Sequence, residues 1–138
     1  MVDTLPDPEI EAVELIEELL DLTEHAAEAG DELPADWTPT SPTFVLVACD
    51  LVASEGTWPV YADCTIRCTV YARGRRRAKR IALDLQALLI DRGSVAPFAR
   101  HRPLTGPLLT RDPSLNADVA SITVRSTLRT VPLVLPGS

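Results

Sequence analysis

Few side chains in this 138-residue chain are of the types that carry catalysis or bind metals. It contains two histidines, His25 and His101, and three cysteines, Cys49, Cys64 and Cys68. Neither histidine has a catalytic partner at a suitable spacing, and no glycine-rich phosphate-binding motif occurs. On a strand, Cys64 and Cys68 would lie about 13 Å apart, too far to share a metal ion or form a disulfide. We therefore expect no enzyme activity, no metal site and no cofactor.

The charged residues are divided along the chain. Residues 1–66 contain 16 acidic and no basic side chains, whereas residues 67–138 contain 13 basic and 4 acidic ones, so the halves carry −16 and +9. Complementary surfaces of this kind steer association and fix its register, within a fold or between neighbouring copies. Compositional drift without a role stays as an alternative, because exposed ion pairs contribute only about 0–1 kcal/mol each.

The strongest local signal is a basic run that opens a predicted helix. Its members are Arg73, Arg75, Arg76, Arg77, Lys79 and Arg80. Positive charge is unfavourable at a helix N-terminus, so another group should stabilise it. An acidic patch on a neighbouring subunit, nucleic-acid phosphates and water are the candidates, and the acidic total disfavours nucleic acid. Carboxylates of the first predicted helix could form that patch, and these are Glu14, Glu17, Glu18 and Asp21.

Two helices are expected to position these charges. Asp7 is a suitable N-cap before Pro8, and apolar residues at helical spacing predict a first helix over residues 8–30, which Gly30 would end. Its apolar positions are Val13, Ile16, Leu19, Leu20 and Leu22. Residues 31–42 contain three prolines and predict an extended link. A second helix is expected over residues 75–92, with a buried stripe of Ala78, Ile81, Ala82, Leu85, Leu88 and Leu89.

Alternating and β-branched residues predict strands in the rest of the chain. Residues 43–71 read as a hairpin with its turn at 54–57, which would place Cys49 opposite Cys64 and all three cysteines on the apolar face as reduced thiols. A final strand is expected over residues 118–131. Residues 94–117 contain five glycines or prolines and predict a long irregular loop that contains Arg100, His101, Arg102 and Arg111.

These elements predict one α+β domain, with a small mixed or antiparallel sheet and two main helices packed against it. Aromatic residues make up only 4% of the chain, so the core should be aliphatic. No apolar run reaches the roughly 18 residues that a membrane span needs. The N-terminal sequence lacks the features of a secretion signal, and an intracellular location is therefore expected.

Four sequence segments, taken in this order of elements, resemble a known family. They are Pro42–Val47, Thr69–Gly74, Ala78–Leu89 and Ser121–Arg125, and the resemblance covers roughly residues 8–132. The chain resembles the tail terminator and tail completion proteins of long-tailed bacteriophages. The resemblance implies a small α+β domain that forms a hexameric ring on the last ring of tail-tube subunits, stops tube polymerisation and presents a surface to the neck of the filled head.

This resemblance implies a structural virion protein, without catalysis, that is assembled in the host cytoplasm and located at the head–tail junction. Its expected partners are further copies of itself, the tail-tube protein and head–tail connector proteins. A ring needs two different surfaces per subunit, which the acidic and basic halves could supply. The four side chains at positions 100, 101, 102 and 111 would then contact the neck or the tube.

Genome DNA would pass through the ring without specific binding, because an acidic lumen offers no Lys or Arg to its phosphates. Two alternatives stay open. One is another connector or neck completion subunit. The other, from a different class, is a nucleic-acid-binding regulator that uses the basic run from Arg73 to Arg80.

Overall fold

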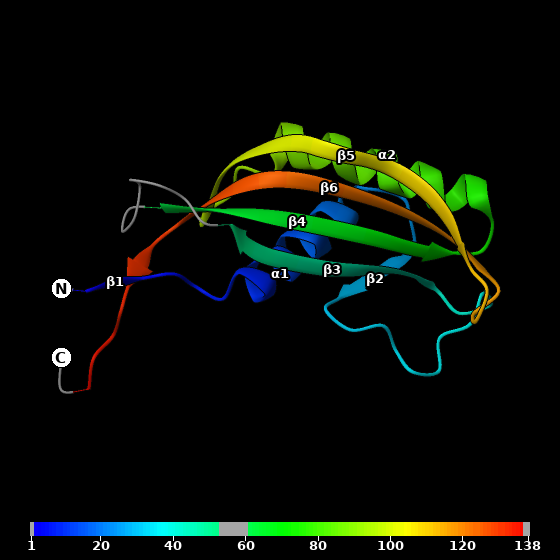
Figure 1. Ribbon diagram of the computed structural model, residues 1–138, viewed down its shortest axis with the longest axis horizontal. Coiled ribbons are helices and arrows are strands. Elements are labelled where there is room, and N and C mark those ends of the chain that lie inside the picture. Colours follow the sequence, from blue (N-terminus) through cyan, green and yellow to red (C-terminus); the bar gives the residue numbers. More distant parts are fainter. Residues whose placement is uncertain (1, 53–60, 137–138) are drawn as a thin grey trace.

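The computed structural model describes residues 2–52 and 61–136. The chain folds as one α+β domain in which two helices pack against a five-stranded mixed sheet, as expected (Figure 1). In chain order the elements are β1 (Asp3–Thr4), α1 (Pro8–Asp21), β2 (Ala27–Gly30), β3 (Thr43–Val52), β4 (Tyr61–Ala72), α2 (Arg75–Arg92), β5 (Phe98–Asp112), β6 (Ala117–Arg129) and β7 (Val131–Pro132). The turn predicted at residues 54–57 lies outside the described residues.

The main sheet has the strand order β2-β3-β4-β6-β5. β2 runs parallel to β3, and every other neighbouring pair is antiparallel. The two short strands β1 and β7 form a separate antiparallel pair at the end where the chain termini lie (Figure 1). Two strands therefore form the edges of the main sheet, the short β2 on one side and the long β5 on the other.

Both helices lie on the same face of the main sheet, behind it in Figure 1. α1 packs on β2 and β3, whereas α2 packs on β4, β5 and β6. The core between them is aliphatic, as expected, and its fully buried large side chains include Ile16, Ile66, Ile81, Leu85, Leu89, Ile122 and Leu128. α2 also has the predicted bounds.

The second face of the sheet carries no helix. Its central strands present polar side chains there, because their alternate residues are buried on the other side. At one end the proline-rich link covers this face, and Trp37 packs with Phe44 and Ala117 in a small second core. The Trp37 indole donates a hydrogen bond of 2.9 Å to the carbonyl of Pro42, and its ring meets Tyr71 edge-on.

The first helix is shorter than predicted. It begins as expected, with the Asp7 carboxylate accepting hydrogen bonds from two backbone N–H groups of the first turn. It ends at Asp21 rather than at Gly30, and the Thr23 hydroxyl donates to the carbonyl of Leu20 just beyond the end. Residues 27–30 form β2 instead, because pairing with β3 overrides the high helix propensity of alanine.

The register of the β3–β4 pair differs from the prediction by two residues. Cys49 lies opposite Ile66 and not opposite Cys64, and Cys68 lies opposite Val47. All three cysteines nevertheless face the core, because a shift of two residues leaves every side chain on its original face. The hydrophobic pattern alone therefore could not distinguish the two registers.

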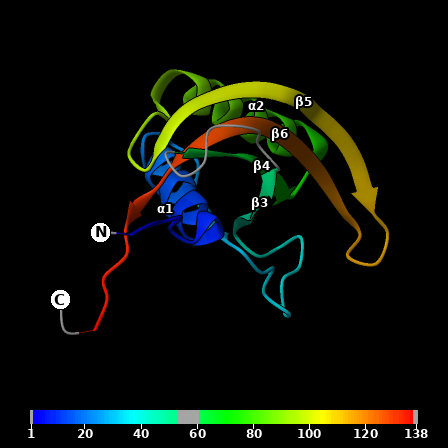
Figure 2. The same ribbon diagram turned by 60° about the vertical axis from the view of Figure 1, so that its left-hand side comes forward.

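The prediction of a long loop over residues 94–117 is wrong. Most of this segment is β5, a 15-residue edge strand that pairs with β6 and arches over one side of the sheet (Figure 2). The pairing shows register irregularities between Phe98 and Arg100 and around Thr105. An edge strand tolerates proline, because the N–H group that proline lacks can be one that would face away from the partner strand. The register irregularities accommodate the glycine and prolines that led to the loop prediction.

Candidate functional site: separate acidic and basic surfaces

The predicted carboxylates of α1 are all exposed and lie on two sides of the helix. Glu17 and Asp21 line a groove of about 410 Å³ between α1 and β2, where Glu28 of β2 adds a third carboxylate. Glu14 and Glu18 lie on another side, beside residues 95–98. No cation lines the 410 Å³ groove among the described residues. We call the surface formed by Glu14, Glu17, Glu18, Asp21 and Glu28 the acidic surface.

Crowding of like charges on α1 is visible in the neighbouring Glu11. Partial burial raises the pKa of Glu11, and the negative charges of Glu14 and Asp7 raise it further. Burial is the larger cause of this raised pKa, and the two neighbouring carboxylates add a smaller repulsion. A cationic partner placed near α1 would relieve this repulsion.

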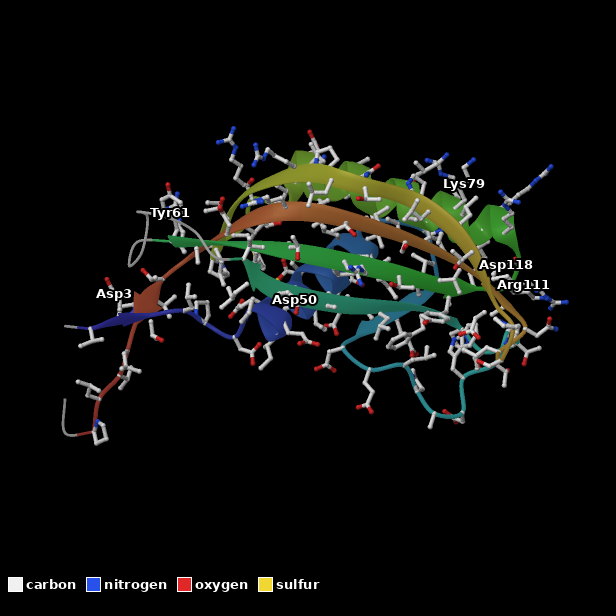
Figure 3. The ribbon with its side chains drawn as sticks, viewed as in Figure 1. Asp3, Asp50, Tyr61, Lys79, Arg111 and Asp118 are labelled. Carbon is white, nitrogen blue, oxygen red and sulfur yellow. The ribbon has the colours of Figure 1, made fainter. Side chains whose placement is uncertain are left out.

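The basic run surrounds the start of α2, and all six of its side chains are exposed. Gly74 caps the helix with φ of 91°, a conformation that favours glycine, and it supplies no side-chain hydrogen bond. The first turn contains no acidic residue. We call the surface formed by Arg73, Arg75, Arg76, Arg77, Lys79 and Arg80 the basic surface, and Figure 3 shows Lys79 near the end of the molecule opposite to Asp3.

Little of this charge is neutralised inside the chain. Within residues 2–52 and 61–136, only the Asp63–Arg125 pair joins a carboxylate of the acidic half to a cation of the basic half, at 3.1 Å. Of the ten side chains predicted for a subunit interface, Arg80 alone has an ion pair in that part of the chain, and its partner is Asp84 at 2.9 Å. The acidic and basic surfaces are therefore both available to a partner.

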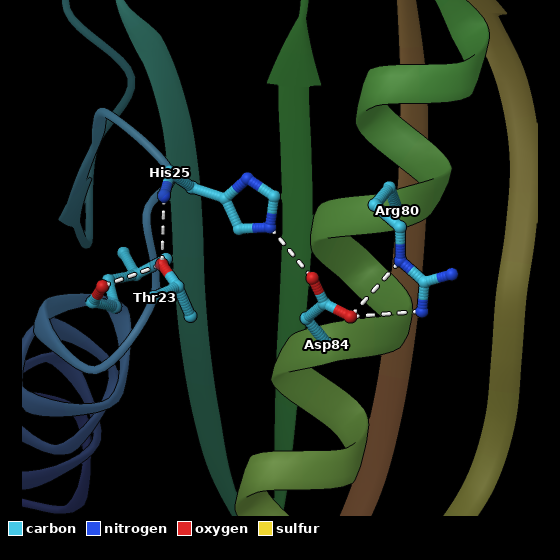
Figure 4. Close-up of polar contacts among 5 residues, drawn as sticks. Thr23, His25, Arg80 and Asp84 are labelled. Atoms are coloured by element: carbon cyan, nitrogen blue, oxygen red, sulfur yellow. Dashed lines mark hydrogen bonds and ion pairs between the residues drawn. The ribbon is translucent and has the colours of Figure 1, made fainter.

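A histidine–carboxylate pair links α2 to the segment that follows α1 (Figure 4). His25 Nε2 lies 2.8 Å from a carboxylate oxygen of Asp84, which also accepts from Arg80. Partial burial alone would raise the pKa of Asp84, but the hydrogen bonds from His25 and Arg80 outweigh it and hold that pKa below its usual value. The 59-residue separation of His25 and Asp84 explains why sequence reasoning missed this contact.

This arrangement lacks the nucleophile that a histidine–carboxylate pair would activate in a hydrolase. The nearby Thr23 hydroxyl donates to Leu20 and accepts from the backbone N–H of His25, and no bond joins it to the imidazole ring in the described structure. The contact instead fastens the end of α1 to the middle of α2.

The four residues predicted for the neck or tube contact lie on β5 and not on a loop. Arg100 and Arg102 are exposed, and they pair in the sheet with Thr127 and Arg125 on its helix-free face. Arg111 lies near the β5–β6 connection, where it bonds to Asn116 and Asp118 (Figure 3).

His101 is 8% exposed, so its predicted contact role is wrong. Its ring nitrogens lie 2.6 Å from the Ser126 hydroxyl and 2.6 Å from the Gly93 carbonyl. Burial lowers the pKa of His101, and the Gly93 hydrogen bond offsets this in part. His101 therefore fastens β5 to β6 and to the end of α2.

The helix-free face is hollowed beside the β5–β6 connection. A groove of about 620 Å³ there is lined by hydroxyl side chains and by two exposed cations, Arg67 and Arg111. The hydroxyl residues are Thr69, Tyr71, Thr105, Thr110, Ser121 and Thr123.

The three cysteines are free and buried, as predicted. Burial raises the pKa of Cys68 to about 12. Contact with Cys64 and burial together raise the pKa of Cys49 above its usual value. Among the described residues no group of three or more potential metal ligands is close enough to hold an ion.

Compared with protein-family models and with curated proteins, the sequence matches none of them. In residues 2–52 and 61–136, no helix is both long enough and apolar enough to cross a membrane. Because neither comparison gives a match, the candidate site is defined by the acidic and basic surfaces of the structure alone.

Proposed function

We propose that this chain is a structural subunit of a bacteriophage tail, a tail terminator that forms a hexameric ring on the tail tube and joins it to the neck of the head. The observation that carries the proposal is the exposed separation of charge between the acidic surface on α1 and β2 and the basic surface at the start of α2. A ring places a different surface of each subunit against the next, and this chain presents two complementary ones.

The α+β fold class agrees with the fold that the family resemblance implies. Arg100 and Arg102 supply exposed cations away from the basic surface, and they suit the separate contact with tube or neck proteins. Other copies of the chain, the tail-tube protein and the connector proteins are then its partners. Its location is the head–tail junction of the virion, and genome DNA passes through the ring without specific binding.

Particle mass and images test the proposal together. Light scattering at low salt should give the mass of a closed oligomer, and negative-stain micrographs should show rings. Raising the salt from about 0.1 M to 1 M should favour monomers, because the Debye length falls from about 10 Å to 3 Å. A parent protein that stays monomeric at all concentrations, without tail tubes or with them, would contradict the proposal.

Charge reversal separates this function from DNA binding. Replacing Arg75, Arg76 and Arg77 by Glu should abolish rings while leaving the fold intact, because surface changes usually alter stability by within about 0.5 kcal/mol each. The matched control replaces Arg100, Arg102 and Arg129 by Glu, which changes the net charge by the same amount. This control should still form rings but should bind tail tubes poorly. If instead the first variant forms normal rings and only loses retention on DNA, the nucleic-acid-binding alternative is favoured.

A further inference from the structure

The C-terminal segment carries apolar side chains into solvent. β7 is held by β1, and the backbone N–H of Leu133 donates to the carbonyl of Val2 at 2.8 Å. Beyond this anchor Leu133, Val134 and Leu135 are 42%, 85% and 45% exposed. Figures 1 and 2 both show this segment leaving the body of the domain. We call residues 133–136 the C-terminal arm.

Scattered exposed apolar residues are ordinary, but three in succession between two prolines are not. Pro136 favours extended backbone at Leu135, the residue before it, and Pro132 does the same at Val131, just before the arm. An arm of this kind is typical of a segment that is buried against another surface.

The molecule also has an open surface cavity whose exposed lining is mostly apolar. It has a volume of about 440 Å³ and lies between the end of α1 and the middle of α2. Leu22, Ala87 and Leu88 form its apolar wall, and the Asp84–His25 contact of Figure 4 borders it. Leu22 and Leu88 were expected in the core, yet Leu22 is 57% exposed and Leu88 is only half-buried. Their exposure gives the cavity wall an apolar surface that a partner could cover.

The arm does not lie in the cavity of its own chain. Figures 1 and 2 both show it leaving the domain on the side away from α2, whose middle forms one wall of the cavity. An occupant from another chain is therefore needed to cover that wall.

We propose that this cavity receives the C-terminal arm of a second copy of the chain, with the arm's apolar side chains against Leu22, Ala87 and Leu88. The inference rests on the self-association proposed above and adds an apolar contact to its charged surfaces. Charge would then steer the copies together, while burial of the arm would hold them.

Cysteine cross-linking tests the contact directly. One batch carries Ala87→Cys and another carries Val134→Cys, and the two full-length proteins are mixed under mild oxidation. We expect a disulfide-linked dimer in the mixture and none when Ala87→Cys is mixed with the control Leu104→Cys, whose parent residue is 54% exposed. The native cysteines are buried and should contribute no background.

Two results would overturn the inference. The first is no cross-link in the mixture. The second concerns a double variant that carries both Ala87→Cys and Val134→Cys. If its disulfide forms only within one chain, the cavity is occupied by the chain's own arm and not by that of a second copy.

Removing residues 133–138 should raise the protein concentration at which half the chains assemble by at least about tenfold, since burial of one large apolar side chain already corresponds to that factor. Normal assembly of this shortened chain would contradict the arm contact and leave the ring proposal standing. A parent that cross-links yet never exceeds a dimer would contradict the ring and uphold the arm contact.

Discussion

Replacing His101 by Leu should destabilise the fold strongly and in a pH-dependent way. The Gly93 carbonyl can only accept, so Nε2 of His101 donates to it and Nδ1 accepts from the Ser126 hydroxyl. Leu fills a similar volume and makes neither bond, which leaves two buried polar groups unpaired. At about 1–3 kcal/mol for each of the two groups, the free energy of unfolding at pH 7.5 should fall by about 2–6 kcal/mol.

The pH dependence has a definite sign. Burial lowers the pKa of His101 in the folded protein below the value of 6.5 in the unfolded chain, so the unfolded state binds the proton more readily. Above pH 6.5 the imidazole is neutral in both states and its contribution is complete. As the pH falls below 6.5 that contribution is lost, by at most about 1.4 kcal/mol per pH unit. The difference between the parent and the Leu variant should therefore narrow in acid.

Urea unfolding of both proteins between pH 5 and 8 measures this difference. Ser126→Ala is the matched control, because it removes one hydrogen bond, keeps the imidazole and should cost about half as much. A Leu variant as stable as its parent, or a difference that does not change with pH, would refute the structural role given to His101.

Three further tests address the packing. Gly93→Ala should lower the free energy of unfolding by about 2 kcal/mol or more, because its Cβ would lie 2.4 Å from the Leu89 carbonyl and 2.8 Å from the His101 ring. Gly106→Ala should cost about 1–3 kcal/mol, since φ is +123° and the Cβ would lie 2.8 Å from the Ser121 carbonyl. Parent-like urea midpoints for either variant would contradict this packing. Native Cys49, Cys64 and Cys68 should react with a bulky thiol reagent far more slowly than in denaturant, and equal rates would show that the thiols are accessible.

Sequence reasoning succeeded where one periodicity dominates. The stripe of α2 and the alternation of β4 and β6 each place apolar residues at one spacing, and the structure has these elements close to their expected bounds. The start of α1 followed from Asp7 and Pro8, whose preferences are local.

The failures concern contacts that local sequence does not encode. Ala27, Glu28 and Ala29 are helix-forming by propensity, yet residues 27–30 pair with β3 across the proline-rich link. β5 contains two prolines, Pro103 and Pro107, which an edge strand tolerates.

The site was predictable to a similar extent. The distribution of charged residues along the sequence predicted the acidic and basic surfaces, because charged side chains are exposed in almost any fold. Glu28 lies beside Glu17 and Asp21 only because β2 pairs with β3, which local sequence does not predict. His101 is not a surface contact residue, because its side chain on β5 points into the domain. The contact of His25 with Asp84 depends on helix packing alone.

Mixing two charge-reversed proteins tests the central claim, that neighbouring copies join through these surfaces. The first variant replaces Arg75, Arg76 and Arg77 by Glu, and the second replaces Glu14, Glu17 and Glu18 by Lys. Losing three pairs at about 1 kcal/mol each weakens an interface by roughly 100-fold, so each variant alone should be monomeric.

In the mixture each reversed surface meets a complementary one, and a ring with an even number of subunits can alternate the two proteins. Light scattering of the mixture should therefore give the ring mass of the parent, with both proteins present in equal amounts. Rings formed by either variant alone, or a mixture of folded proteins that stays monomeric, would contradict the account.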